Sequence, residues 1–287
     1  MDDLGTTDLV IGPAKLRGVV ERVGQGLNKL GLSPNQSSRF ALHRGRLESL
    51  LNLYGKSVKA PTLSLRRYQQ AIYDFCVLDM AMSRLGPAWK PHVEKVLGGN
   101  DLPWRDKNDI ARNSEFELYL AAVLRRAGFK VWPCEPDVLF EAHGWRLCVA
   151  AKRLRSRAKF RERVRDGVCQ ITRSKVPGFV AVDASVTCLS RDEYAQGKDP
   201  HIVSRYVHAA LNDLSTELLG VEEFRQPSPF VLGVMLTAFV PTFLIDGSDS
   251  TFSTVGERMW ITTAEKTNPR AKQINRIARQ IAAVPLH

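Results

Sequence analysis

An acid and a lysine stand near the two ends of the stretch 136–152, which reads PDVLFEAHGWRLCVAAK. Its pattern predicts two short strands joined by a turn at His143-Gly144. Side chains alternate between the faces of a strand, so Ala150 and Lys152 share one face, and the neighbouring strand can bring Asp137 close to both. Two carboxylates and a lysine could hold Mg²⁺ and stabilise the developing charge of phosphodiester hydrolysis. Position 150, however, carries no carboxylate.

The bulk properties indicate a globular protein with a polyanionic partner. The net charge of +11 and the pI of about 9.6 favour nucleic acid over a membrane surface. The five cysteines are scattered without a CxxC pair, which predicts reduced thiols and no zinc. The first residues begin acidic and lack a long apolar run, so we expect no signal peptide and a cytoplasmic protein. The apolar stretch 230–245 is too short to span a bilayer and contains Pro241, so we expect two buried strands there and no membrane contact.

Helical periodicity and breakers divide the chain near residue 105. The first part predicts four helices, at 14–33, 37–54, 64–85 and 89–97. The second part predicts helices at about 113–126, 157–173, 201–219 and 268–283, and strands at 129–132, 137–141, 145–151, 178–185, 230–238 and 256–263. Helices that alternate with buried strands predict an α/β domain with a central mixed sheet flanked by helices. We therefore expect a helical N-terminal region at 1–104, for recognition, a partner or dimerisation, and a second domain at 105–287.

The ordered series of elements from 110 to 185 resembles the PD-(D/E)xK nuclease superfamily, which has the restriction-endonuclease-like fold. The matching features are the acidic helix NSEFELYLAAVLRRAGF, Pro136-Asp137, the strand RLCVAAK that ends in Lys152, the KRLRS that follows, and the strand GFVAVDAS. The rest of the C-terminal half matches only in outline, and the first hundred residues do not match.

The resemblance implies a metal-dependent phosphodiesterase, specifically a Mg²⁺- or Mn²⁺-dependent deoxyribonuclease that acts as an endonuclease. In this family pattern Asp137 is the principal metal ligand, Lys152 orients water and stabilises charge, and Glu117 is a further metal or water ligand. Glu115 competes with Glu117 for that role, but the acid that follows the phenylalanine is the usual one. The implied partner is DNA, with RNA not excluded, and a homodimer is possible. A role in restriction or anti-phage defence would fit.

Ala150 departs from the family pattern, which has Asp or Glu at that position. The chain is either a nucleic-acid-binding protein with a degenerate site, a nuclease whose acid has migrated, or a nuclease inactivated by an engineered Glu→Ala change. Glu141 lies roughly 13 Å from Asp137 along its strand, at about 3.3 Å per residue, which excludes it as the migrated acid. Asp183 remains a candidate. Unless the acid has migrated, we expect this chain as written to bind metal poorly and to cleave little or nothing.

A basic run follows the candidate lysine. From Lys152 to Lys175 the sequence has ten Lys or Arg residues against two acids. Such a run borders the scissile phosphate in the expected fold, so we predict phosphate contacts from its cations. The residues assigned to nucleic-acid binding are Arg153, Arg155, Arg157, Lys159 and Arg161, together with Gln170, which resembles a glutamine used near the lysine in some nucleases of the group.

Overall fold

The elements of the computed structural model follow the sequence pattern closely. The structure describes residues 2–10, 12–53, 62–106, 108, 110–188, 195–197, 200–218, 220–221, 228–246, 249–262 and 269–285. Its α-helices are α1 (Pro13–Lys29), α2 (Arg39–Leu53), α3 (Thr62–Arg84), α4 (Lys90–Val96), α5 (Ile110–Arg126), α6 (Phe160–Ser174), α7 (Pro200–Leu218) and α9 (Pro269–Ala282). Its strands are β1 (Asp2–Val10), β2 (Lys130–Cys134), β3 (Asp137–Ala142), β4 (Trp145–Arg153), β5 (Gly178–Asp183), β6 (Ala195–Gly197), β7 (Val231–Asp246) and β8 (Asp249–Thr262).

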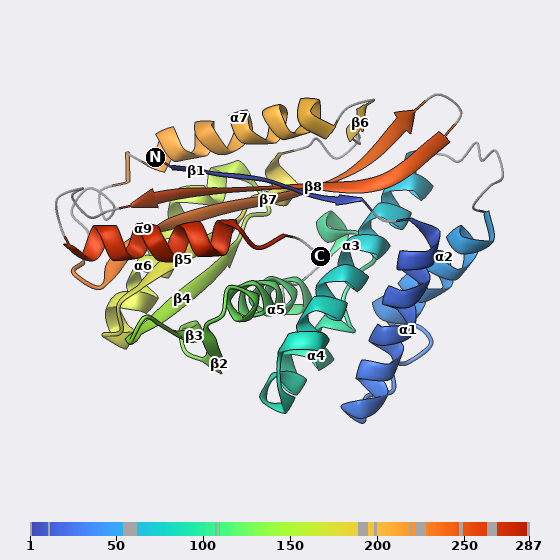
Figure 1. The fold of residues 1–287 in the computed structure, drawn as a ribbon, viewed down its shortest axis with the longest axis horizontal. Coiled ribbons are helices and arrows are strands. Elements are labelled where there is room, and N and C mark those ends of the chain that lie inside the picture. Colours follow the sequence, from blue (N-terminus) through green and yellow to red (C-terminus); the bar gives the residue numbers. More distant parts are fainter. Residues whose placement is uncertain are drawn as a thin grey trace.

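The described strands form one mixed sheet, in the order β1-β8-β7-β5-β4-β3-β2, with β6 beside β7 (Figure 1). β4, β5 and β7 are parallel neighbours, whereas β2-β3-β4 and β7-β8-β1 are antiparallel. Every residue of β5 is buried, as expected for a strand covered on both faces. The expected α/β architecture with a central mixed sheet is therefore confirmed.

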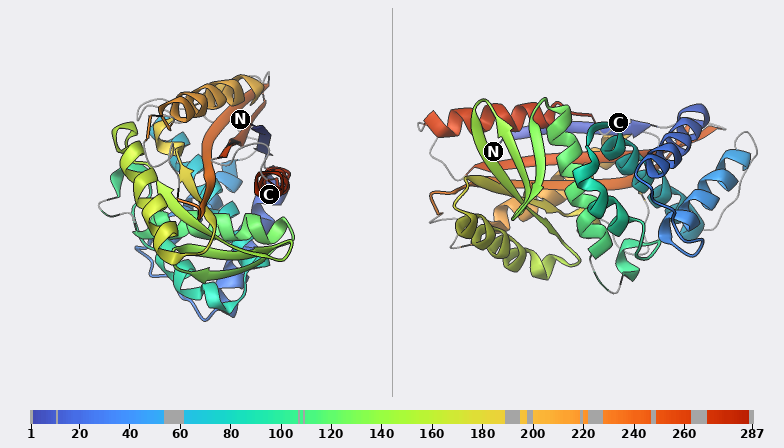
Figure 2. Two further views of the ribbon diagram at one scale, coloured as in Figure 1. Left: turned by 90° about the vertical axis from the view of Figure 1, so that its left-hand side faces the viewer. Right: turned by 90° about the horizontal axis from the view of Figure 1, so that it is seen from below.

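Two layers of helices cover the sheet. One cluster of buried side chains joins α6 and α7 to alternate residues of the central strands, including Cys148, Ala150 and Val180. The other cluster joins α1 to α5 and α9 to the opposite residues, including Val149 and Phe179. Figure 2 shows α6 and α7 on one side of the strands and α9 on the other. A residue of β4 therefore faces either α6 or α5, and the even-numbered positions face α6.

The region 1–104 is less separate than the sequence pattern indicates. Its helices α1 to α4 bury their apolar faces in the same cluster as α5 and β4, so no boundary of the core falls at residue 104. In addition, Asp2–Val10 forms β1, which pairs antiparallel with β8 at the edge of the sheet. The segment before α1 is thus a strand of the C-terminal sheet, and the region is not wholly helical.

The apolar stretch around Pro241 forms one strand, so the prediction of two strands within it is wrong. β7 runs from Val231 to Asp246 and pairs with β8 along its length. On its other side β5 pairs only as far as Thr237, and β6 begins at Thr242. Proline lacks an N–H group, and Pro241 falls in this gap between the two partners. Among the described helices, none is both long and apolar enough to cross a membrane.

Candidate functional site

Asp137 and Lys152 lie side by side where β3 begins and β4 ends. The Lys152 Nζ atom is 3.6 Å from the Asp137 Oδ2 atom. The same carboxylate oxygen accepts a hydrogen bond of 2.7 Å from the Ala151 backbone N–H, and Lys152 Nζ donates to the Ala151 carbonyl oxygen at 2.9 Å. The β3–β4 register, in which Val138 lies opposite Val149, places Asp137 across from Ala150. The hairpin thus assembles the predicted acid and lysine.

The Asp137 carboxyl is held in an environment that resists its ionisation. Its pKa is raised from 3.8 to about 6, chiefly by burial; the positive charge of Lys152 opposes this rise, and the negative charge of Glu117 adds to it. The side chains of Asp137 and Lys152 are only 18% and 11% exposed, so the pair is largely desolvated. A carboxylate kept in this state costs folding free energy, which is common at functional sites.

Replacing Asp137 by asparagine should stabilise the fold at pH 8 and have little effect at pH 4. The folded pKa of about 6 lies above the ordinary value, so the cost of ionisation is absent below about pH 4 and complete above about pH 6. The shift corresponds to about 3 kcal/mol at pH 8, a net value that already includes the favourable Lys152 and Ala151 contacts. Urea denaturation of the parent and of Asp137→Asn at pH 4 and pH 8 measures this difference in the free energy of unfolding. Glu141→Gln, on the same strand, is the control, and an equal effect of Asp137→Asn at both pH values would refute the prediction.

Ala150 is completely buried in the apolar cluster beneath α6. It shares that cluster with Phe160, Val164 and Val168 of α6 and with Val180, its partner on β5. The expected arrangement of Ala150, Lys152 and Asp137 along one face agrees with this alternation. The methyl group occupies the place where the family pattern has an acid.

Glu117 contacts the neighbouring helix as well as the site. Its Oε2 atom lies 3.2 Å from the Nε2 atom of His92 on α4, and His92 in turn lies against Trp89, with ring centroids 5.0 Å apart. Its charge also acts on Asp137. Sequence reasoning missed His92, because the pair joins two helices 25 positions apart. Glu115, by contrast, is not a solvated acid of the first helical turn, since its residue is only 4% exposed and it pairs with Arg39 and Arg112.

A basic groove opens beside Lys152, with a volume of about 410 Å³. Its lining comes from the end of β4, from α6 and from the start of α5: Asn113, Ala151, Lys152, Arg153, Arg163, Arg165, Asp166, Cys169, Gln170 and Arg173. The Gln170 Oε1 atom is buried and has no hydrogen-bond partner among the described residues. The groove therefore combines five cations, one acid and amide groups next to the Asp137–Lys152 pair.

The structure divides the cations predicted to bind nucleic acid into internal and surface groups. Arg153 is only 8% exposed in its side chain and binds Asp183, with 3.0 Å between Nε and Oδ2. Arg155 donates a hydrogen bond to the Asp106 carbonyl oxygen. Arg153 therefore lies largely inside the fold, whereas Arg155 is exposed. Phosphate contact by these two arginines stays a prediction.

The surface cations of the run are partly neutralised by acids. Arg157 lies 3.3 Å and Arg161 3.6 Å from Glu217 of α7, and Lys159 lies 2.6 Å from Glu162. All three side chains are more than half exposed, so these ion pairs are weak and a phosphate can displace them. Phosphate contact by these three residues stays a prediction.

Neither alternative acid reaches the Asp137–Lys152 pair. Glu141 lies at the other end of β3, where it pairs with Lys130 at 3.7 Å. Asp183 of β5 is directed to the α5 side, where its carboxylate binds Arg153 and accepts a hydrogen bond of 2.9 Å from the Ser185 N–H. The Asp183 carboxylate is thus bound to other partners. Neither Glu141 nor Asp183 therefore takes the place of an acid at position 150.

The described residues do not make a complete Mg²⁺ or Mn²⁺ site. Within them, no group of three or more His, Cys, Asp or Glu side chains is placed to hold a metal ion. Asp137 and Glu117 supply carboxylate oxygens of the kind that Mg²⁺ prefers, but the third donor would come from position 150. Metal binding by Asp137 and Glu117 therefore stays a prediction.

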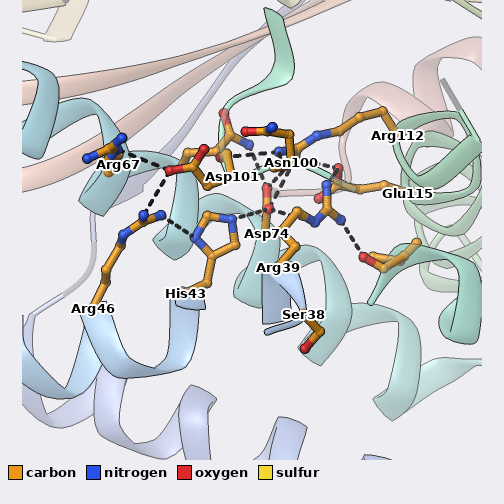
Figure 3. A network of polar contacts seen from close by, with 12 residues as sticks. Ser38, Arg39, His43, Arg46, Arg67, Asp74, Asn100, Asp101, Arg112 and Glu115 are labelled. Atoms are coloured by element: carbon orange, nitrogen blue, oxygen red, sulfur yellow. Dashed lines mark hydrogen bonds and ion pairs between the residues drawn. The ribbon is translucent and has the colours of Figure 1, made fainter. Parts of the chain in front are cut away.

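A buried ionic network lies behind the site and was not foreseen from the sequence (Figure 3). At its centre the Arg112 guanidinium lies 2.9 Å from Asp74 and from Glu115, and 3.2 Å from Asp106. Arg39 and His43 of α2 approach the same Asp74 carboxylate at 3.6 and 3.1 Å. The network joins α2 and α3 to α5. It is also connected to the segment that follows Lys152, because Arg155 donates a hydrogen bond to the Asp106 carbonyl oxygen.

Comparisons with protein-family models, with curated proteins and with solved structures found no match to this chain. Functional inference therefore depends on the geometry of the residues themselves.

Proposed function

We propose that this chain binds nucleic acid, DNA first, in the basic groove, and that its Asp137–Lys152 pair belongs to a metal-dependent phosphodiesterase site of the PD-(D/E)xK kind. That site lacks one carboxylate, so the chain as written binds its substrate and cleaves little or none of it. An acid at position 150 would complete the site.

One observation carries the proposal: Lys152 lines the basic groove and at the same time contacts Asp137. A phosphodiester drawn into the groove by Arg163, Arg165 and Arg173 would meet the Lys152 ammonium group, which can stabilise negative charge on the phosphate. The acid opposite position 150 and the nearby Glu117 then lie at the same end of the sheet. This coincidence favours phosphodiester chemistry over binding alone.

The decisive experiment restores an acid at position 150. Purified Ala150→Glu and Ala150→Asp should nick plasmid DNA in the presence of Mg²⁺, whereas the parent should not. Two side-chain lengths are used because Ala150 is completely buried, and circular dichroism must show that each variant is folded. Adding Lys152→Ala to the active variant should lower the nicking rate by about 100-fold, as for loss of a group that stabilises transition-state charge.

Arg44→Ala, a change of an exposed cation on α2, is the matched control and should leave nicking by the Ala150→Glu or Ala150→Asp variant unchanged. Folded variants with an acid at 150 that cut neither DNA nor RNA would overturn the catalytic part of the proposal.

A second candidate is a nucleic-acid-binding protein that has lost the enzyme site. The observation in its favour is the complete burial of Ala150 among apolar side chains, which is the packing expected of a hydrophobic position. Salt-sensitive binding of DNA, without cleavage by either acidic variant, would support it. Cutting of RNA alone would instead support a ribonuclease.

A further inference from the structure

The outer face of the C-terminal helix α9 carries positive charge that no acid among the described residues compensates. Lys272, Arg276 and Arg279 are exposed and line one hollow of about 450 Å³, together with Asn275, Gln280 and Ala283. Their spacing of four and three residues places them on one helical face. No acid occurs between residues 269 and 287, and none of these three cations pairs with an acid among the residues that the structure describes. This face differs from that of α6, whose cations Arg161 and Arg163 have acidic partners.

The other side of α9 is not available to a ligand. Ile274, Ile277 and Ile281 are at most 3% exposed and lie in the core cluster on the α5 side of the sheet. The helix is also fixed at its end, because the Arg258 guanidinium donates to the carbonyl oxygens of Ile281 and Val284, at 2.9 and 2.8 Å. An amphipathic helix that binds a bilayer must bury its apolar face in the lipid. The apolar face of α9 is already buried, so only its cationic face can bind a partner.

We propose that this face of α9 is a second nucleic-acid contact, which binds the phosphate backbone. The three cations span about 10 Å of helix axis, at 1.5 Å per residue. This length equals about three base-pair steps along a DNA duplex, at 3.4 Å of axis per phosphate of one strand. The backbone of α9 is anchored by its apolar face and by Arg258, so the spacing of the three cations along the helix is set before a polyanion binds. The amides of Asn275 and Gln280 supply further hydrogen-bonding groups along the same face.

The contact on α9 is separate from the basic groove. Gln280 accepts or donates a hydrogen bond of 2.9 Å with His143, in the turn between β3 and β4. Lys152 lies nine residues further on, near the opposite end of β4. The eight residues from Trp145 to Lys152 cover roughly 23 Å of strand, at 3.3 Å per residue. The inference rests on the proposed nucleic-acid binding, and adds a second place on the surface where the same class of partner is held.

Charge reversal on α9, compared with a matched reversal elsewhere, tests the proposal. The triple variant Lys272→Glu, Arg276→Glu and Arg279→Glu is compared with Lys15→Glu, Arg17→Glu and Lys29→Glu on α1, where all three cations are also exposed. Both changes lower the net charge by six, from +11 to +5. Binding of a labelled DNA duplex is measured by fluorescence anisotropy over a series of salt concentrations. The α9 variant should lose about 10-fold or more in affinity, and its salt-dependence slope should fall by about 2–3, at 0.9 per phosphate contact.

Each outcome has a distinct consequence. A loss confined to the α9 variant supports the contact, whereas equal losses in the two variants would reduce it to an effect of net charge and overturn it. If the parent binds phosphatidylserine vesicles through α9 but not DNA, the assigned partner is wrong. A third variant, Arg163→Glu with Arg173→Glu, separates this inference from the proposed function. If only the Arg163→Glu, Arg173→Glu variant loses DNA binding, the groove stands as the binding site and the α9 contact is refuted. If binding depends on α9 but neither Ala150→Glu nor Ala150→Asp cleaves nucleic acid, the α9 contact stands and the proposed enzyme activity is refuted.

Discussion

Replacing Arg112 by methionine should lower the free energy of unfolding by about 3–5 kcal/mol, as expected when one member of a buried ion cluster is removed. Arg112 is 1% exposed, and its guanidinium contacts Asp74, Asp106 and Glu115. It also donates hydrogen bonds to the carbonyl oxygens of Asn100 and Asp101. Methionine fills a similar volume but removes the cation from among these acids, and Arg39 then remains beside Asp74 and Glu115.

The loss should shrink as the pH falls. Burial by itself raises the pKa of Asp74, but Arg112 and Arg39 hold it well below its usual range. The stability that this carboxylate contributes is therefore present at neutral pH and is lost only when the pH falls through its depressed folded pKa. Burial and the charge of Asp74 raise the pKa of Glu115. Without Arg112 the pKa values of both acids rise, so protonation relieves the buried charge as the pH falls.

Urea denaturation of parent and Arg112→Met at pH 7 and pH 5 measures this effect. Arg44→Met is the control, because Arg44 is 56% exposed in an i,i+4 pair with Glu48 and should change stability by no more than about 0.5 kcal/mol. A loss below about 1 kcal/mol for Arg112→Met at pH 7 would contradict a structural role for the network. A loss that grows toward pH 5 would contradict the assigned protonation states.

The elements of the sheet and helices were largely predictable because their signals are local. The stripe of Phe116, Leu120 and Val123 predicts α5, and the Gly31 backbone, with φ of +64°, ends the first helix where a glycine is expected. β1 was not predictable, because its segment DDLGTTDLV lacks an apolar run and is ordered by pairing with β8, about 250 positions away. Strand pairing depends on context of this kind more than helix formation does.

The same distinction applies to the site. Asp137 and Lys152 could be placed together from alternation alone, since a hairpin joins their strands. The ion-pair partners of the charged residues could not be predicted from the sequence, because a charge pattern does not reveal which cations are paired. Arg157 meets Glu217 across 60 positions, and Arg39 meets Glu115 across 76. An arginine run thus combines structural and surface residues that only the fold separates.

Gly178→Ala should destabilise the fold by about 3 kcal/mol, at the upper end of the range for overpacking. Gly178 begins β5 and pairs with Cys148 on β4. A Cβ atom there would overlap the Cys148 carbonyl oxygen and lie 2.6 Å from its Sγ atom. The backbone on the other side is fixed as well, because the Gly178 N–H donates to the Phe230 carbonyl oxygen at 2.8 Å. A backbone atom cannot rotate away as a side chain can, so the two parallel strands must move apart.

The strand that would move is the one that carries Ala150 and Lys152, so stability and site geometry should fail together. Thermal and urea denaturation measure the stability, and fluorescence anisotropy with labelled DNA measures whether the site still binds. Gly45→Ala is the matched control: Gly45 is exposed in α2, a Cβ atom added there would meet no other atom within 4 Å, and alanine should stabilise the helix by about 0.5–1 kcal/mol. Opposite signs for the same Gly→Ala change are expected because backbone entropy favours alanine at both positions, while only Gly178 meets a fixed backbone atom. A stabilised Gly178→Ala protein would show that β4 and β5 are not held as closely as the site requires.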